Sequence, residues 1–433
     1  MKIGIEGDRC RDGHLYDKGD IRMRELSLYL HIPFCARKCR YCDFLSWPAA
    51  EREREEYLEL LLLEIEKQSF FYKEYQVMSV FVGGGTPSLL EPDAVKTIFE
   101  KLNHDFTIEK DCEITMEANP DSLTGEKLSA YLQAGVNRLS IGLQSADDEE
   151  LRQIGRIHDY RTFRNAYEMA RQSGFRNVNI DLMAALPGQT YDSYRRTLER
   201  VLLLKPEHIS AYSLILEEGT WLYEHRSELT FPTEDEDRAL YELTGELLGK
   251  YNYKRYEISN YALAGYECRH NQVYWTRGNY LGLGLGAASL VNDVRWNNPR
   301  SIAEYRRRLR QADVTDMDSE LAEPVHGLTG FACGKSHTGE NRLAAARTRL
   351  GDNIQYLSRQ EQMEEFMFLG LRLTNGVRKQ DFQEKFGVPI ETVYEKELEE
   401  LQRDGLLIVE ESVRLTPYGT DISNYVMAKF LFG

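Results

Sequence analysis

Short apolar runs alternate with longer segments of helical period along the first half of the chain. Six runs have the length and composition of buried strands, at residues 27–31, 77–82, 113–117, 138–142, 178–183 and 208–215. Between them, apolar residues recur every three to four positions, at residues 54–71, 92–104, 125–134, 148–172 and 191–204. Strands that alternate with helices predict right-handed crossovers and a parallel sheet. Six such units predict an α/β protein with an open, partial (β/α)6 TIM-like barrel.

The predicted domain organisation follows the points where this pattern changes. The chain begins with polar, aperiodic residues, and periodicity is lost again after the middle of the sequence. A final segment of three helices and a small hairpin is typical of a winged-helix-like α+β domain. The predicted parts are a loose leader at 1–22, the barrel at 23–220, an extension of the barrel at 221–320, an irregular insertion or disordered loop at 321–352, and the C-terminal domain at 353–433.

Polar residues and glycines mark the ends of the predicted strands, where the reacting groups of parallel barrels gather. They are a cysteine loop after the first strand, GGGTP at 83–87 after the second, Glu117 at the end of the third, Gln144 after the fourth, Asp181 in the fifth and Ser213 in the sixth. The glycine turn allows close backbone approach and is expected to leave amide N–H groups free for a carboxylate or carbonyl. Burying Glu117 would be costly unless it pairs with a hydroxyl or a cation.

Three cysteines in the first of these loops form the most specific motif. Cys35, Cys39 and Cys42 have C-x3-C-x2-C spacing, so three thiolates within eight residues can converge on one inorganic centre. A structural zinc site usually has four ligands in two pairs, whereas this array is an unpaired triplet. Disulfides are the other alternative, but no secretory signal is found, and thiols stay reduced inside cells. A cluster of four irons, with one iron open to a small ligand, is the favoured interpretation.

Composition and charge narrow the remaining classes of protein. The 433 residues carry a formal net charge of −16, which disfavours a general nucleic-acid binder because such proteins need basic surface to replace counterions. No run of about 18 uncharged apolar residues occurs, so no membrane span is predicted and a cytoplasmic location is expected. Winged-helix-like domains often bind nucleic acid, but four glutamates crowd the relevant helix, at Glu395, Glu397, Glu399 and Glu400. A lid or a partner-docking role is expected instead.

The cysteine array, with Tyr41 just before its last member, resembles the signature of radical S-adenosylmethionine (SAM) proteins. The strings YLHIPFC and YCDF resemble the branch that contains oxygen-independent coproporphyrinogen III oxidase and the HemW-type haem chaperones. The resemblance implies a partial TIM-like barrel and a [4Fe–4S] cluster whose open iron binds the amino and carboxylate groups of SAM. It also favours Met23 as the true start, because related proteins begin near MRELSLYLHIPFC.

The same resemblance assigns SAM-binding roles to residues near the strand ends. Residues Gly84, Gly85 and Thr86 correspond to those that contact the amino end of SAM. Other positions correspond to residues that hold its ribose, adenine and carboxylate groups or line its pocket, namely Tyr29, Tyr41, Glu117, Gln144, Arg156 and Asp181. A guanidinium at Arg156 fits a carboxylate partner.

A second motif, HNQVYW at residues 270–275, matters most for the choice of function. His270 could be an axial ligand of haem iron, and Tyr274 and Trp275 could stack on a macrocycle. His270 and Trp275 could equally be core residues. The motif resembles the HNxxYW of HemW-type haem chaperones. Three glycines follow, and they are expected to leave the backbone mobile enough to approach a flat ligand, at Gly282, Gly284 and Gly286.

Two functions of different classes remain. The first is a SAM-binding haem chaperone, which the intact HNxxYW favours. The residue two positions after Cys42 also favours it: the oxidase branch resembles C-x3-C-x2-C-x-C, with a further cysteine there, whereas this chain has Phe44. The second is a radical enzyme that cleaves SAM to a 5′-deoxyadenosyl radical and oxidises a porphyrin-related substrate or haem itself. The implied partners are haem, an unidentified haem acceptor and an electron donor such as flavodoxin or ferredoxin. Membrane contact is expected only through the acceptor.

Overall fold

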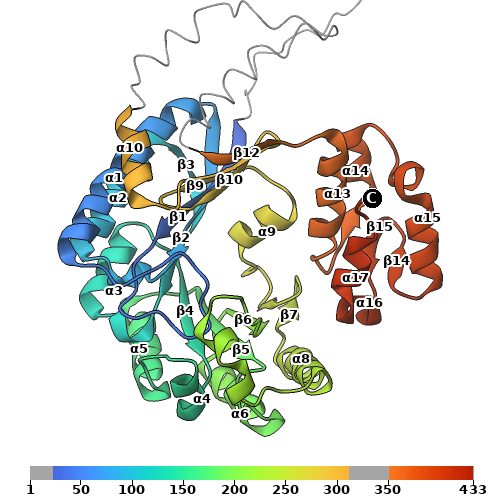
Figure 1. Ribbon diagram of the computed structural model, residues 1–433, viewed down its shortest axis with the longest axis horizontal. Helices are drawn as coiled ribbons and strands as arrows, with labels where there is room; N and C mark the ends of the chain where they lie inside the picture. Colours follow the sequence, from blue (N-terminus) through green and yellow to red (C-terminus); the bar gives the residue numbers. More distant parts are fainter. Residues whose placement is uncertain (1–22, 312–350, 433) are drawn as a thin grey trace, which may run out of the picture.

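The computed structural model describes residues 23–311 and 351–432, which form a large parallel-sheet domain and a smaller domain beside it (Figure 1). The leader predicted at 1–22 lies outside the described residues, as does most of the insertion predicted at 321–352. Within the two described ranges, no helix is both long enough and apolar enough to cross a membrane.

Six parallel strands from the first half of the chain frame the larger domain. They lie side by side in the order in which they follow along the chain. Their bounds are β1 Arg24–Ile32, β2 Tyr75–Gly84, β3 Thr107–Ala118, β4 Arg138–Gln144, β5 Val178–Ala184 and β6 His208–Ser213. The predicted fold class is therefore confirmed: the crossovers form a partial (β/α)6 TIM-like barrel.

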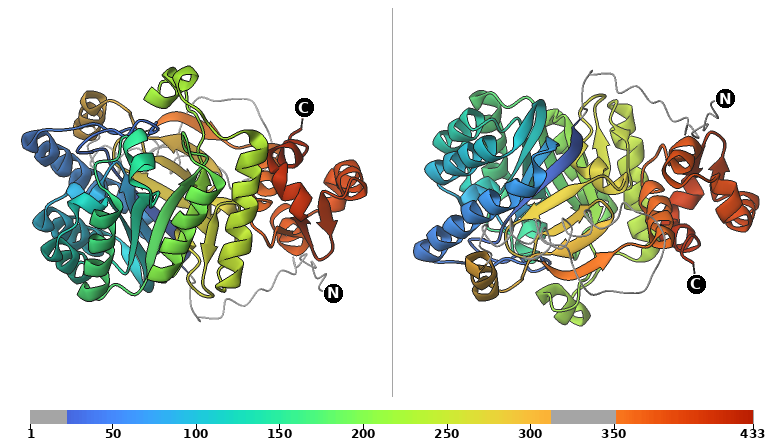
Figure 2. Two further views of the ribbon diagram at one scale, coloured as in Figure 1. Left: turned by 90° about the horizontal axis from the view of Figure 1, so that it is seen from below. Right: turned by 90° about the horizontal axis from the view of Figure 1, so that it is seen from above.

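Helices between these strands cover the outer face of the sheet (Figure 2). They are α1 Glu51–Ser69, α2 Pro92–Asp105, α3 Gly125–Gln133, α4 Asp148–Gln153, α5 Tyr160–Ser173 and α6 Tyr191–Leu204. The segment predicted as helical at 148–172 is thus two helices. Local signals fix several ends: α6 begins with a capping box between Thr190 and Ser193, and α5 ends at Gly174, whose φ of +117° suits glycine.

Side chains along each strand alternate between these helices and the lumen of the barrel. On β1, Leu28 and Leu30 are fully buried in the hydrophobic core that includes Leu61 of α1. Tyr29 lines the lumen, and its hydroxyl bonds to His31, two residues along the same face. Each buried leucine contributes about 1.5–3 kcal/mol to the free energy of unfolding. The side chains that face the helices therefore stabilise the barrel, and the side chains that face the lumen can be polar and available to a ligand.

Later segments extend the sheet at both edges, giving a sheet of twelve strands within the described residues. Beyond β1 lie β9 Tyr280–Leu283, β10 Ala288–Val291, β11 Val294–Asn297 and β12 Asp352–Tyr356, and beyond β6 lie β8 Asn260–Ala262 and β7 Lys254–Arg255. Strand β9 runs parallel to β1, and β10 to β12 are antiparallel. The sheet therefore continues past residue 353, where the sequence predicted the C-terminal domain to begin.

The glycines around β9 are packed tightly, and the prediction that they approach a flat ligand is wrong. Gly282 and Gly284 are buried. A Cβ on Gly282 would overlap the backbone of Ala288, and a Cβ on Gly284 (φ +95°) would overlap the Tyr57 hydroxyl. Glycine is required at these positions because neighbouring chain segments pack closely there. A glycine-rich sequence alone does not distinguish close packing from backbone mobility.

Besides the short α7, Trp221–Glu224, three further α-helices belong to the larger domain. They are α8 Glu234–Lys250, which packs on α6, α9 Arg269–Trp275, which packs on β2, and α10 Ile302–Gln311, which packs on α1. The start of α8 is fixed by a capping box between Thr233 and Glu236.

The C-terminal domain is a small α+β unit, as the sequence predicted. Its elements are α13 Arg359–Gly370, β13 Val377–Arg378, α14 Lys379–Phe386, α15 Ile390–Arg403, β14 Leu407–Val409, β15 Ser412–Leu415, α16 Pro417–Asp421 and α17 Ser423–Ala428. The three strands form an antiparallel sheet around a core that includes Met367, Phe382 and Tyr394. Figure 2 places this domain (red) beside the yellow segments of the larger domain, away from the blue helices.

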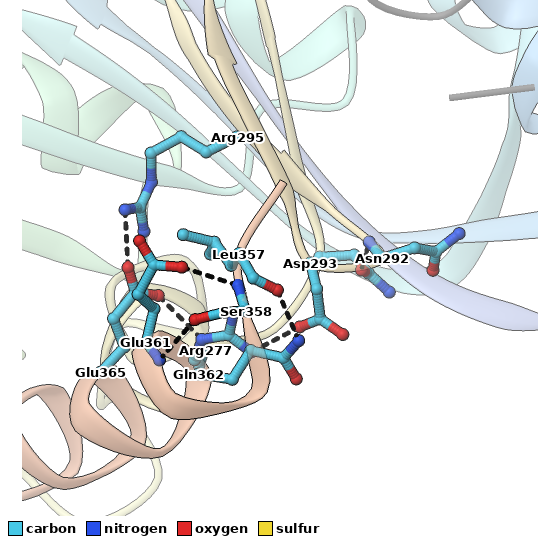
Figure 3. Close-up of polar contacts among 10 residues, drawn as sticks. Arg277, Asn292, Asp293, Arg295, Leu357, Ser358, Glu361, Gln362 and Glu365 are labelled. Atoms are coloured by element: carbon cyan, nitrogen blue, oxygen red, sulfur yellow. Dashed lines mark hydrogen bonds and ion pairs between the residues drawn. The ribbon is translucent and has the colours of Figure 1, made fainter. Parts of the chain in front are cut away.

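A buried ion-pair network joins the two domains (Figure 3). Arg277, just after α9, pairs with Glu365 of α13 at 2.8 Å and with Asp293 at 2.6 Å. Glu365 also pairs with Arg295 of β11 at 2.6 Å. Arg277 and Glu365 are both buried, so neither charge can be satisfied by water if its partner is lost.

We predict that Arg277→Ala lowers the free energy of unfolding by about 3–5 kcal/mol, because it leaves Glu365 buried with an incomplete set of partners. Urea denaturation followed by circular dichroism measures this change. The matched control is Arg378→Ala, which removes the exposed Arg378–Asp381 pair and is expected to cost less than about 1 kcal/mol. Equal losses in the two variants would contradict a special role for the buried network.

Candidate functional site

The loop that carries the cysteines runs from β1 to α1 at the carboxyl end of the barrel. Its two ends are held together, because the Cys35 N–H donates to Trp47 O at 3.1 Å. In its middle, the Arg40 N–H donates to Ile154 O at 3.0 Å, beyond the end of α4. The fold therefore brings Cys35, Cys39 and Cys42 to one loop, where all three thiols are free and partly exposed.

The surroundings of these thiols fit an iron–sulfur cluster. Thr86 Oγ1 donates to Cys35 Sγ at 3.5 Å, and Arg156 Nη1 donates to Cys39 Sγ at 3.6 Å. Donors of this kind stabilise negative charge on cluster sulfurs and tune the cluster's potential. Burial raises the pKa of Cys42 to about 11, so this thiol holds its proton until a metal displaces it.

The glycine turn after β2 lies against the start of the cysteine loop. Gly85 N–H donates to Ile32 O at 2.8 Å, Thr86 N–H donates to Phe34 O at 2.7 Å, and Gly84 N–H donates to Glu117 Oε2 at 3.1 Å. The expectation that these amides are free for a ligand is therefore wrong. Gly84 has a φ of +109°, and a Cβ there would overlap the ring of His31, so glycine is required for packing as well as for backbone conformation.

Two carboxyl groups face the lumen below this turn. Burial, reinforced by the nearby Asp181 carboxylate, raises the pKa of Glu117 to about 8. Burial also raises the pKa of Asp181, although it accepts hydrogen bonds from Asn179 Nδ2 at 2.7 Å and Ser140 Oγ at 3.0 Å. A cation entering the lumen would favour the ionised form of both groups, and a neutral or anionic ligand would not.

The end of β4 supplies two more of the predicted residues. Gln144 is buried and has a φ of +71°, a left-handed conformation that a non-glycine residue seldom adopts. Arg156 is buried too, and its Nη2 donates to Gly142 O at 2.6 Å and to Asn119 Oδ1 at 2.7 Å. Burial raises the pKa of Tyr41, which packs beside Leu151 and Ile154. The guanidinium of Arg156 thus lies between the lumen and the cysteine loop.

A pocket of about 210 Å³ within the lumen brings together residues from both sequence motifs. Among the predicted residues, its lining includes Tyr29, Glu117 and Asp181 from the SAM set, with His270 and Tyr274 from HNxxYW. Trp275 is not part of it and instead lies under Arg372 of the C-terminal domain, 4.4 Å from guanidinium carbon to ring centroid. The three haem candidates therefore do not form one surface for a macrocycle.

His270 is enclosed by protein contacts. It is 1% exposed, and burial, with the nearby positive Arg138, lowers its pKa to about 3. Ser79 Oγ donates to Ser27, so it accepts from His270 Nδ1–H at 2.8 Å, which leaves Nε2 to accept the Tyr274 hydroxyl at 2.9 Å. Both ring nitrogens are thus engaged, and an iron bound at Nε2 would have to displace Tyr274.

The most prominent residue that the sequence reasoning missed is Arg138. It is 2% exposed, lines the same pocket, and its Nε has no hydrogen-bond partner among the described residues. A signal was present, because Arg138 and Ser140 alternate with the apolar Leu139 and Ile141, and even spacing along a strand places side chains on one face. Arg138 lies at the start of β4, whereas the rule for parallel barrels points to the carboxyl ends of strands.

We predict that Glu117→Gln removes part of the pH dependence of stability. The folded protein binds the Glu117 proton more tightly than the unfolded chain, so this group's contribution falls as pH rises from about 4.5 to about 8. The slope is at most about 1.4 kcal/mol per pH unit. Urea denaturation between pH 5 and 8 should show that the free energy of unfolding of the variant rises relative to that of the wild type as pH rises. The exposed control Glu126→Gln should keep the wild-type slope of the free energy of unfolding against pH. A slope for Glu117→Gln equal to that of the wild type would refute the prediction.

Known proteins resemble this chain over nearly its full length. It matches the Radical SAM superfamily over residues 29–201 and the HemN C-terminal domain over residues 357–422. It is 34% identical to "Heme chaperone HemW" of Bacillus subtilis, over 94% of this chain and 99% of that one. It is 36% identical to the protein of that name in Escherichia coli, over 69% of this chain and 81% of that one.

A solved structure supports the same placement at the level of the fold. Coproporphyrinogen III oxidase (HemN) from Escherichia coli, described as a radical SAM enzyme, superposes with a TM-score of 0.77 at 22% identity. The alignment covers 94% of this chain and 90% of that chain. With the cysteine loop, the barrel and these full-length relatives in agreement, the chain belongs to the HemW family of the radical SAM superfamily.

Proposed function

We propose that this protein is a haem chaperone, which binds haem and transfers it to an acceptor protein. The observation that carries the proposal is the 34% identity, over 94% of the chain, to a protein named heme chaperone, together with an intact HNxxYW at residues 270–275. The acceptor is a protein that lacks haem before transfer.

In this proposal the chain also holds a [4Fe–4S] cluster and SAM. Cys35, Cys39 and Cys42 would bind three irons, and the fourth iron would bind SAM and supply an electron to it. The arginine at Arg156 is suited to orient a carboxylate near the cysteine loop, because it already donates to Cys39 Sγ. Glu117 and Asp181 would accept hydrogen bonds from hydroxyl groups of the ligand. The remaining SAM residues are those proposed from the resemblance: Tyr29, Tyr41, Gly84, Gly85, Thr86 and Gln144.

Partner proteins are proposed on chemical grounds. An electron donor such as flavodoxin or ferredoxin would approach the cysteine loop, which exposes the cations of Arg37 and Lys38. Both side chains are fixed, since Arg37 Nη2 donates to Gly155 O at 2.8 Å and Lys38 Nζ donates to Phe44 O at 3.0 Å. Fixed positive charge beside the cluster suits an acidic donor.

Two observations favour the chaperone over a coproporphyrinogen oxidase. Phe44 stands two residues after Cys42, where the oxidase branch is expected to carry a further cysteine, and its side chain is 61% exposed. The lumen pocket of about 210 Å³ is smaller than the roughly 300–1,000 Å³ of pockets that enclose drug-sized ligands. A porphyrin-sized molecule is therefore better accommodated outside the lumen than beside Glu117 and Asp181.

The second candidate function is a radical SAM oxidoreductase acting on a porphyrin-related substrate. It is supported by three residues proposed to bind SAM that line the lumen pocket, Tyr29, Glu117 and Asp181, and by Arg156, which contacts Cys39 Sγ. Chaperone and enzyme differ in one measurable respect: an enzyme turns over its substrate, whereas a chaperone binds haem and releases it unchanged.

We predict that Cys39→Ala abolishes the broad visible absorbance of the reconstituted cluster, because the two remaining cysteines cannot keep the cluster bound to the protein. The matched control is Cys112→Ala, a buried cysteine outside the array, which should retain the absorbance. Absorption spectra and iron content after anaerobic reconstitution measure the effect. Full retention in Cys39→Ala would place the cluster elsewhere.

We predict that the reconstituted wild type binds haem stoichiometrically and converts no coproporphyrinogen III to protoporphyrinogen in the presence of SAM and dithionite. Optical titration with haem and chromatography of the porphyrin products test both parts on one sample. Catalytic decarboxylation would favour the second candidate function. Absence of haem binding would contradict the chaperone.

A further inference from the structure

Histidines differ sharply in whether they can reach an iron atom from outside the protein. Among the described histidines, four are buried and their ring nitrogens bond within the protein or have no access to solvent, namely His31, His158, His208 and His270. The two that reach solvent are His104 and His225. This contrast selects the candidates for a haem ligand without reference to any motif.

His104 lies in a strongly charged setting. Its Nδ1 contacts Asp105 Oδ1 at 2.7 Å, and Lys101 pairs with the same aspartate at 3.1 Å. Its side chain is 83% exposed, so no apolar surface lies around it to receive a porphyrin. A macrocycle bound there would keep most of its apolar area in water, and binding would gain little from the hydrophobic effect.

His225 is oriented for metal binding. It follows α7, Trp221–Glu224, and its Nδ1–H donates to Trp221 O at 2.9 Å, so Nε2 carries the lone pair in the neutral ring. Nε2 has no hydrogen-bond partner among the described residues. A backbone carbonyl that accepts from the other ring nitrogen is the arrangement that fixes tautomer and orientation in metal-ligating histidines.

The ring of His225 is also held in place by stacking. It lies parallel to the indole of Trp221, with 4.0 Å between ring centroids and 12° between planes. The guanidinium carbon of Arg40, from the cysteine loop, lies 4.1 Å from the indole centroid of Trp221, so the indole that stacks on His225 is itself held by a cation–π contact. The imidazole is thus clamped before any ligand arrives, and less rotational freedom is lost when an iron binds.

Apolar surface lies next to this histidine. Trp221, Leu214 and Leu216 are half-buried and pack against the same small buried cluster, and Ile215 between the two leucines is 70% exposed. Such a strip can receive one face or edge of a macrocycle, while the two propionates remain in water. The adjacent Arg226 is exposed, and its guanidinium, which lies over Tyr223 at 4.1 Å from carbon to ring centroid, supplies positive charge for one of them.

We propose that His225 is an axial ligand of the haem iron, in a surface site beside the cysteine loop. The assignment rests on the proposed chaperone function, because it concerns the same cargo. Iron–nitrogen bond formation uses the Nε2 lone pair and requires no proton release from the neutral ring. The site is separate from the lumen, where His270 is closed off by Ser79 and Tyr274.

The test is titration of the full-length reconstituted protein with ferric haem, followed by the Soret band and electron paramagnetic resonance. His225→Ala should weaken haem binding by about tenfold or more and alter the spin-state signature, because an iron–imidazole bond is lost. His104→Ala, the other solvent-reaching histidine, should behave as the wild type. Imidazole added to His225→Gly should restore the wild-type spectrum, which a packing defect would not allow.

The outcomes separate this assignment from the proposed function. Wild-type binding with an unchanged His225→Ala would overturn the assignment and leave the chaperone intact. Weakened binding without a spectral change or imidazole rescue would also overturn it, since His225 would then only support the surface. A wild type that binds no haem would overturn the proposed function, and the assignment with it.

Discussion

The seating of α9 beneath the lumen is the interaction on which the two domains and the lumen pocket depend. Glu113 of β3 accepts the backbone N–H of Arg269 and of His270, both at 3.1 Å, through its two carboxylate oxygens. An open parallel sheet has a polar inner face that must be closed against water, and this short helix closes it with His270 and Tyr274. Without that contact, the Ser27–Ser79–His270–Tyr274 hydrogen-bond chain would lack its anchor.

The same helix joins the barrel to the C-terminal domain. Its last residue, Trp275, lies under Arg372, and Arg277 immediately beyond it pairs with Glu365 of α13. The HNxxYW motif therefore has two faces, one closing the lumen and one receiving the other domain. Its residue types follow from this geometry: a buried imidazole and phenol that satisfy one another, and an indole that accepts a cation on its ring face.

Periodicity and motif spacing predicted the frame of the fold well, because six strands and their helices each leave a local signal. Contacts between distant segments leave none. The backbone N–H groups of Gly85 and Thr86 donate to β1 and to the loop after it, and Gly282 packs against Ala288. The sequence suggested that these glycines leave the backbone free for a ligand, whereas in the structure they allow close packing of neighbouring segments. The cysteine loop was identified because its chemistry lies within eight residues. His225 belongs to no motif, and only its stacking and its exposure distinguish it.

The contacts of the cysteine loop give it a direct mechanical connection to the proposed haem site. Leu222 N–H donates to Arg40 O at 3.0 Å, and the Arg40 side chain lies on Trp221, which in turn stacks on His225. Arg40 stands between Cys39 and Tyr41, so the loop contacts the segment of Trp221 and Leu222 through both its backbone and its side chain. Coupling between sites travels through packed contacts of this kind. If His225 binds haem iron, Arg40 and Trp221 link the cysteine loop to the ligand of that iron.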